Sequence, residues 1–157
     1  TNKIAIFKTV YADGELENTW KWHWDDNSGP HIKLFIYLTD VTEDTAPFSH
    51  LSSREGAPIK MRSSKISPLW SEEPHFPNSR IPESFINKKI EDGYAIKRAC
   101  GKAGTHLIFD PNIIHKGTVP DPGKSRIALV YHMHPTTSKT NEFYNIKNRD
   151  VKKYDLL

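Results

Sequence analysis

The sequence predicts an all-β fold, a double-stranded β-helix of the jelly-roll or cupin-like kind, with short helices and a long proline-rich insertion. Short runs rich in Val, Ile, Phe and Tyr recur along the chain, and Gly, Pro, Asn and Asp residues separate them. This is the pattern of strands joined by turns. Helical periodicity is almost absent. Residues 44–84 are rich in Pro, Ser, Glu and Arg, so we expect loops and at most short helices there.

The size and charge of the chain limit its class. At 157 residues it fits a single domain over residues 1–157. Its net charge of +3 and its scattered basic residues argue against a nucleic-acid partner. A lone Cys100 excludes a disulfide framework and a cysteine-based metal site. The apolar runs are far shorter than the roughly 20 residues that span a bilayer, so we expect a protein that does not enter a membrane, and the lone cysteine is compatible with the reducing cytoplasm, where we expect it.

The first part of the chain is predicted to form three strands. Residues 3–11 precede an Asp-Gly turn, so we expect a hairpin. Residues 19–25 alternate strictly, which places three packing tryptophans on one face and His23 and Asp25 on the other. After a break at residues 27–30, the nearly continuous apolar run at 31–38 predicts a strand that is buried on both faces.

The second half of the chain predicts a helix and further strands. A short helix over residues 84–90 would be capped by the hydroxyl of Ser84. Beyond residue 136 the sequence is polar, and we expect it to trail over the surface. The runs bounded by turn residues predict strands at 93–98, 105–109, 113–115 and 125–134.

Three residues have the chemistry of a non-haem iron site. Because side chains alternate along a strand, His23 and Asp25 point to the same side. Two imidazoles and one carboxylate on one face of an octahedron leave open positions for a co-substrate and O₂. The third ligand has to come from a distant strand. We expect it to be His115, which follows an Asp-Pro-Asn turn and lies at a barrel edge.

Arg126 is the residue we expect to bind a carboxylate. It follows His115 by eleven positions and opens the strand at 125–134. Its planar guanidinium can form a bidentate pair with a carboxylate, and the small Ala128 beside it leaves space for a slim ligand. His132 and His134 share this face and are candidates for the pocket wall. Such patterns arise by chance, so the spacing alone leaves a purely structural role for the histidines open.

Several segments of the sequence occur in the order found in one known family. They are WHWDD at 22–26, the stretch 32–48, GTHLIFD at 104–110, IHKGT at 114–118 and SRIAL at 125–129. Together they resemble the phytanoyl-CoA dioxygenase family of Fe(II)- and 2-oxoglutarate-dependent oxygenases. Family members usually carry a Pro-Gly-Ser-His-like signature where this chain has residues 51–56, and they tend to be longer.

The resemblance implies a cofactor set and a reaction. Iron would be bound by His23, Asp25 and His115, and Arg126 would bind the C5 carboxylate of 2-oxoglutarate. The reaction would hydroxylate a C–H bond of a small organic substrate, such as a lipid, an amino acid or a carrier-bound acyl group, with O₂ as co-substrate and release of succinate and CO₂. The halogenating relatives replace the metal carboxylate by a small residue, so Asp25 favours hydroxylation.

Three further residues are predicted near the cofactors. Lys33 and Tyr37 share one face of their strand, and Thr118 lies close to the metal loop. Because metal ligands must be deprotonated, we expect activity to fall as the pH drops through the imidazole range. Two other functions remain open at this point. One is a jelly-roll binding module without catalysis, and the other is a metal-dependent cupin enzyme that uses no ketoacid.

Overall fold

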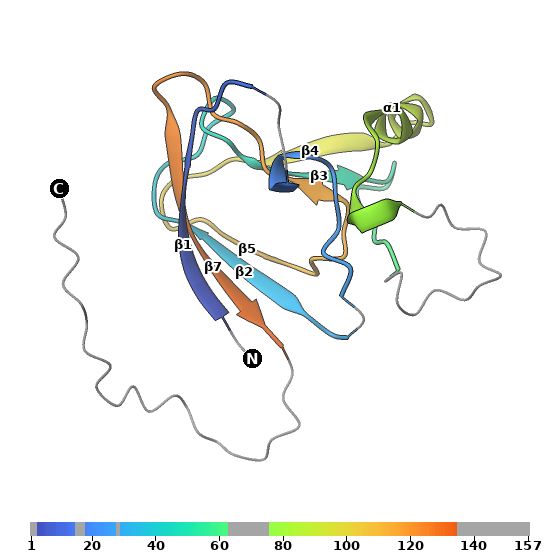
Figure 1. The fold of residues 1–157 in the computed structure, drawn as a ribbon, viewed down its shortest axis with the longest axis horizontal. Coiled ribbons are helices and arrows are strands. Elements are labelled where there is room, and N and C mark those ends of the chain that lie inside the picture. The colour runs from blue at the N-terminus through green and yellow to red at the C-terminus, as the bar shows by residue number, and fades with distance from the viewer. Residues whose placement is uncertain (1–2, 15–17, 28, 63–75, 135–157) are drawn as a thin grey trace, which may run out of the picture.

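This computed structural model, which describes residues 3–14, 18–27, 29–62 and 76–134, is built around two antiparallel sheets (Figure 1). The first sheet has the strand order β1-β7-β2-β5, with bounds Lys3–Val10, Ser125–Met133, Ile32–Tyr37 and His106–Phe109. The second sheet has the order β4-β3-β6, with bounds Ala95–Ala99, Phe48–Ser52 and His115–Lys116. The helical elements are α1 (Glu83–Glu91) and two 3-10 turns, η1 (Asn18–Trp20) and η2 (Pro77–Ser79). This mostly β, antiparallel arrangement is consistent with a jelly-roll-like fold.

Strand β7 shows why the first sheet has one buried face. Arg126, Ala128 and Val130 are buried, and the residues between them are only partly buried. This is the period of two that a strand requires when one of its faces packs on a core. The register places Val130 opposite Phe35 and Ala128 opposite Tyr37. The strand predicted at 125–134 is therefore confirmed, including its inward face.

Aromatic side chains join the two sheets. The buried hydroxyl of Tyr37 on β2 donates to the carbonyl of Ala99 at 2.7 Å and accepts from the N–H of Phe48 at 3.2 Å. The ring of Phe48 on β3 lies 6.2 Å from Phe35 and 4.6 Å from Phe109 between centroids. The inner faces of the sheets thus contact each other through strands β2, β3, β4 and β5.

A second core forms beside α1. Its buried members come from distant parts of the chain and are Trp22, Trp24, Leu51, Ile81, Ile86 and Ile114. Helix α1 contributes Ile86 to this core. The predicted Ser84 cap is wrong, because the helix starts after Pro82 and no side chain caps it. The extended backbone of Pro82, with a φ of −62° and a ψ of 144°, ends the preceding segment and leads into the first turn.

Strand β3 corrects the expectation of loops and short helices for residues 44–84. Four of the five residues of Phe48–Ser52 are buried. The strand pairs with β4 on one side and β6 on the other. Its sequence has few β-branched residues, so its extended form depends on this central position between two neighbours. Residues 63–75 of the predicted insertion lie outside the described residues.

The structure also corrects three predictions for the first part of the chain. Strand β1 pairs with β7, so the predicted hairpin after residues 3–11 is wrong. The predicted strand at 19–25 is reduced to bridges at His23, preceded by η1. Strand β2 is central, yet Ile32 is 47% exposed, so its outer face is not buried as expected. The predicted tail beyond residue 136 lies outside the described residues.

The other strand predictions agree with the structure to within a few residues. β4 and β5 correspond to the strands expected at 93–98 and 105–109. The short β6 begins at His115 and is an edge strand of its sheet, as expected. No helix among the described residues is long and apolar enough to cross a membrane.

Candidate metal centre

The backbone brings His23 and His115 together from opposite halves of the chain. The N–H of each residue donates to the carbonyl of the other, at 2.9 Å in both directions. Their rings lie 4.3 Å apart between centroids. This pair of hydrogen bonds is an isolated antiparallel bridge, so the two imidazoles leave the backbone side by side.

Local alternation adds Asp25 to the pair. Trp22 and Trp24 are buried in the core beside α1, which leaves His23 and Asp25 on the opposite side of this extended segment. The predicted alternation is therefore confirmed where it matters, although the segment forms no regular strand. Trp20 belongs to η1 and is not part of that core.

Three donor atoms of His23, Asp25 and His115 converge within 4.8 Å of one another. Oδ1 of Asp25 lies 3.8 Å from Nε2 of His23 and 3.8 Å from Nε2 of His115. Ligand atoms held at about 2.1 Å from one ion are separated by about 3 to 4 Å, so this spacing suits a single metal ion. The predicted ligand triad thus comes together in space.

Hydrogen bonds set the orientation of both imidazoles. Nδ1 of His23 lies 2.8 Å from the carbonyl of Lys21, and Nδ1 of His115 lies 2.8 Å from the carbonyl of Ile113. A carbonyl can only accept, so each Nδ1 carries the hydrogen and each Nε2 offers its lone pair. This is the usual arrangement of histidines that bind a metal. The donor set therefore fits a divalent transition metal such as iron.

Burial keeps the two imidazoles neutral. Both side chains are almost inaccessible, and this burial lowers the pKa of His23 and of His115 below the usual value for histidine. A positive charge on His23 would repel one on His115, and this repulsion lowers the pKa of His115 further. The loss of activity through the imidazole range stays a prediction.

Lys33, which was predicted near the cofactors, lies against the carboxylate of Asp25. Its ammonium forms an ion pair with Oδ2 of Asp25, and the Lys33 side chain is 14% exposed. Burial acts to raise the pKa of Asp25, but the charge and hydrogen bond of Lys33, together with the nearby His115 and His23, hold that pKa below its usual value. Asp25 is therefore charged at neutral pH, as a metal ligand must be.

Arg126 is a buried cation on the inner face of β7. Its Nη1 donates to the carbonyl of Ala46 and its Nη2 donates to Oγ1 of Thr9 at 3.2 Å, while its Nε has no hydrogen-bond partner among the described residues. The guanidinium carbon lies 5.3 Å from the ring of Phe35 and 5.9 Å from that of Tyr37. No ion pair joins it to a carboxylate within the described ranges.

The two other predicted cofactor residues make backbone contacts. Tyr37 lies next to Arg126 and uses its hydroxyl to join the sheets, as described above. Thr118 donates its hydroxyl to the carbonyl of Pro47 at 2.9 Å. Their roles in cofactor binding stay predictions.

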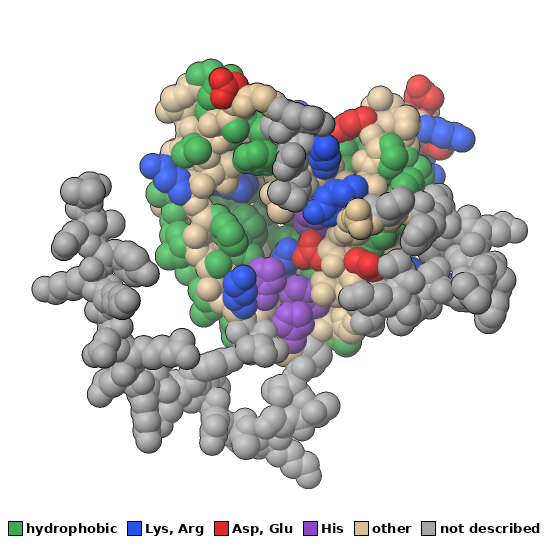
Figure 2. Space-filling model, in the orientation of Figure 1, with side chains coloured by type: hydrophobic (Ala, Val, Ile, Leu, Met, Phe, Trp, Pro, Cys, Tyr) green, Lys and Arg blue, Asp and Glu red, His purple; other side chains and the backbone are tan. Residues whose placement is uncertain are grey.

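A cavity of about 450 Å³ opens onto the candidate metal ligands His23 and Asp25. His132 on β7 and His134, just after the strand, line it, as the face that they share with Arg126 in the sequence predicted. His31, which the sequence reasoning missed, lines it as well. A signal was available, because His31 precedes Lys33 by two positions and a period of two places both on one face. Figure 2 shows histidine side chains gathered on this face beside acidic and basic ones.

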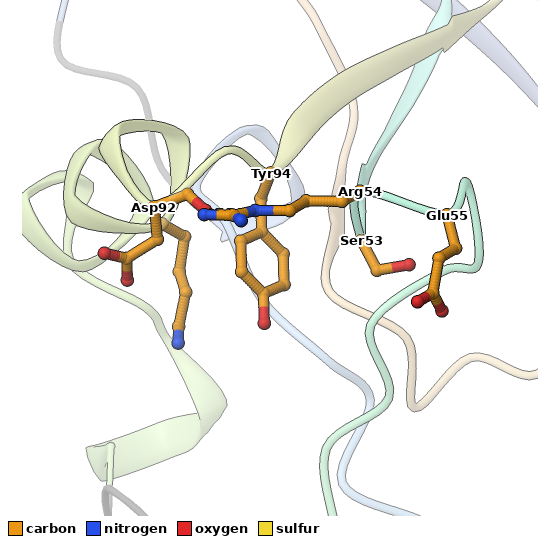
Figure 3. A pocket seen from close by; sticks show the side chains of 6 residues that line it. Ser53, Arg54, Glu55, Asp92 and Tyr94 are labelled. Atoms are coloured by element: carbon orange, nitrogen blue, oxygen red, sulfur yellow. Dashed lines mark hydrogen bonds between the residues drawn. The ribbon is translucent and has the colours of Figure 1, made fainter.

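A second cavity, of about 430 Å³, lies on another part of the surface. Arg54 crosses it and donates from its Nε to the carbonyl of Asp92 at 2.7 Å, above the ring of Tyr94 (Figure 3). Ser53, Glu55 and Lys89 complete its wall. It includes none of the three candidate metal ligands.

Comparison with known proteins adds a distant relative and a similar fold. No family model matches the chain. The chain is 24% identical over 115 residues to an L-proline trans-4-hydroxylase of Streptomyces griseoviridis, which covers 69% of this chain and 43% of that protein. The crystal structure of AviO1 from Streptomyces viridochromogenes Tue57 is similar with a TM-score of 0.50 at 14% identity, over 87% of this chain and 51% of AviO1. EvdMO1 gives a TM-score of 0.47 at 16% identity, over 85% of this chain and 27% of EvdMO1.

Proposed function

We propose that this chain is the core of an Fe(II)- and 2-oxoglutarate-dependent oxygenase of the double-stranded β-helix fold, which hydroxylates a C–H bond of a small organic substrate. One observation carries the proposal. Two Nε2 atoms and one carboxylate oxygen, from His23, His115 and Asp25, face a common point, and each imidazole is oriented by a backbone carbonyl. This set occupies one face of a metal ion and leaves the other positions open.

The buried guanidinium of Arg126 supports the use of a ketoacid with a second carboxylate. A buried charge without an opposite charge is unfavourable, so a site that keeps one usually receives an anionic ligand. Arg126 is 6% exposed, and its Nε has no partner among the described residues. The far carboxylate of 2-oxoglutarate supplies the missing charge in a bidentate pair.

The residues around the triad prepare the site for oxidation chemistry. With 2-oxoglutarate and O₂, the bound iron supplies the oxidant, as in other two-histidine, one-carboxylate enzymes. Lys33 holds Oδ2 of Asp25, which leaves Oδ1 facing both histidines. The rings of Phe48 and Phe109 lie 5.4 Å and 5.7 Å from that of His115 and exclude water on its side.

The comparisons support the reaction class from an independent direction. The relative from Streptomyces griseoviridis is named as a hydroxylase of a small molecule, and its similarity extends over 115 residues. The chain spans less than half of that relative and about half of AviO1. We therefore propose the hydroxylase activity for this protein, with a phytanoyl-CoA dioxygenase-like arrangement of ligands.

Metal and ketoacid binding test this function directly. We expect the purified protein to bind one Fe(II) under anaerobic conditions, to bind 2-oxoglutarate far more tightly with metal than without it, and to release succinate in air. His23→Ala and His115→Ala should abolish metal binding, whereas His106→Ala on the exposed side of β5 should not. Metal binding without any effect on the ketoacid would favour a cupin enzyme of another class. No metal binding at all would leave a jelly-roll binding module.

A further inference from the structure

The cavity beside the metal ligands has a distinctly polar wall. His23 and Asp25 line it, and Trp24 is the one large, mainly apolar side chain among its described lining residues. Residues with amide and hydroxyl side chains also line it, namely Thr19, Asn27, Asn78 and Ser79. Such a wall offers hydrogen bonds to a compact polar molecule and little apolar surface to a long acyl chain.

His31 is a buried side chain without a partner in this cavity. It is 7% exposed, and neither of its ring nitrogens has a hydrogen-bond partner among the described residues. Its ring stacks on His134 at 4.0 Å and on His132 at 5.3 Å between centroids. Burial and these two neighbours lower the pKa of His31 to about 4, so at neutral pH its ring has one N–H donor and one acceptor. A buried polar group of this kind is normally satisfied by a ligand or by water.

Arg80 supplies a positive charge to the same cavity. Its backbone forms a bridge with His23, which fixes it beside the metal ligands. Its Nη1 makes two long contacts of 3.3 Å, to the carbonyl of Asn78 and to Oγ of Ser79. No ion pair within the described ranges involves Arg80. Asp25 is already neutralised by Lys33, so Arg80 can attract a ligand anion.

This cavity is separate from the predicted site for the ketoacid's far carboxylate. Arg126 does not line it, whereas His132 does. The two residues lie on the same face of β7, six positions apart, which corresponds to about 20 Å along a strand. A ketoacid that extends from the metal toward Arg126 therefore leaves the cavity at the His132 end available for another molecule.

We propose that this cavity binds the primary substrate, and that the substrate is a small polar carboxylic acid whose carboxylate pairs with Arg80 while His31 hydrogen-bonds a second polar group. The proposal rests on the proposed oxygenase function, since it assigns the substrate class to the same centre. It excludes long acyl chains as the hydroxylated group, because their apolar surface would lie against polar side chains.

A binding experiment tests the substrate class. Zn(II) replaces iron, and N-oxalylglycine, an unreactive analogue, replaces 2-oxoglutarate. The panel contains L-proline, the other common amino acids and small hydroxy acids, each with its carboxamide, and dodecanoate as a long-chain acid. Saturation-transfer NMR measures binding with and without the metal. We expect at least one small acid to bind, with its carboxamide and dodecanoate weaker by about tenfold or more.

Matched variants assign the residues. Arg80→Gln should lower the affinity for the small acid about tenfold or more, while Zn(II) and N-oxalylglycine bind as before. Arg98→Gln, at an exposed ion pair with Glu43, is the control and should change nothing. His31→Phe keeps the ring stack and removes the ring nitrogens. It should therefore lower the affinity for the small acid without lowering the melting temperature of the protein.

The outcomes separate the two proposals. If wild-type protein binds Zn(II) and N-oxalylglycine but no small acid, or binds acid and carboxamide equally, the substrate class is wrong. If Arg80→Gln loses N-oxalylglycine, the cavity belongs to the ketoacid and the assignment is overturned. Failure of wild type to bind Zn(II) or N-oxalylglycine counts against the oxygenase function, and the acid panel measured without metal still decides the role of the cavity.

Discussion

The ammonium of Lys33 contacts Oδ2 of Asp25, and Oδ1 of the same carboxylate lies 3.8 Å from a nitrogen of each candidate metal-binding histidine. One oxygen of the Asp25 carboxylate therefore contacts a cation of the protein, and the other faces the candidate metal position. This relationship keeps Asp25 charged although it is largely buried.

Replacing Lys33 should destabilise the metal-free protein. In Lys33→Met the charge of Asp25 loses its partner, so we expect the free energy of unfolding in urea to fall by about 1 to 3 kcal/mol. Lys60→Met is the control, because the Lys60–Asp110 pair is much more exposed and should contribute less than about 1 kcal/mol. Saturating Zn(II) should reduce the difference in the free energy of unfolding between Lys33→Met and wild type. Equal losses in the two variants would contradict the role given to Lys33.

Arg126 should determine ketoacid affinity without affecting the metal. Arg126→Met removes the buried charge, and we expect the dissociation constant of 2-oxoglutarate, measured by calorimetry with Zn(II), to rise about tenfold or more. Arg126→Lys retains the charge but not the planar pair of donors, so it should be intermediate. Zn(II) binding should match wild type in both variants. Unchanged ketoacid affinity in Arg126→Met would remove Arg126 from the site.

Tyr37→Phe should weaken the connection between the sheets. The variant removes a fully buried hydroxyl and leaves the N–H of Phe48 and the carbonyl of Ala99 without this partner. We expect a loss of about 1 to 3 kcal/mol in the free energy of unfolding. Tyr131→Phe, on the partly exposed outer face of β7, is the control and should change stability by less than about 0.5 kcal/mol. Similar effects of the two substitutions would show that the Tyr37 hydroxyl does not join the sheets.

Stability of the metal-free protein should fall as the solution becomes acidic. His31 has a pKa of about 4 in the folded protein because it is buried beside two other histidines, whereas in the unfolded chain it titrates near the usual 6.5. Above that value both states are neutral at His31. Between about pH 6.5 and pH 4 only the unfolded chain takes up the proton, so folding loses stability as the pH falls.

Urea unfolding from pH 8 to pH 4 in the presence of a chelator measures this effect. In His31→Phe the free energy of unfolding should fall less steeply with decreasing pH, by at most about 1.4 kcal/mol per pH unit. The variant lacks one group that takes up a proton when the chain unfolds. Parallel curves for the variant and wild type would mean that His31 is accessible to protons in the folded protein.

Much of the candidate site could be predicted from local patterns. The alternation around His23 and Asp25 and the inward face of β7 depend only on the period of an extended chain, which is a property of neighbouring residues. His115 was found through the turn before it, and the structure brings it to the other two. His31 could have been found by extending the same period of two back from Lys33.

Pairing between distant strands could not be predicted in the same way. Strand β1 pairs with β7, more than a hundred residues away, although its sequence ends in a turn that favours a local hairpin. Strand β3 has little intrinsic preference for an extended form, and its two neighbours β4 and β6 stabilise it. Such pairings depend on which apolar faces meet in the folded chain.

The sequence by itself determined which side chains share a face, because alternation is set by the backbone geometry of each short segment. Tertiary structure alone decided that Lys33 contacts Asp25, that Tyr37 joins the sheets and that Arg80 and His31 line one cavity. Each of these contacts joins segments that are brought together only when the two sheets and the core beside α1 pack, and that packing is a property of the whole chain.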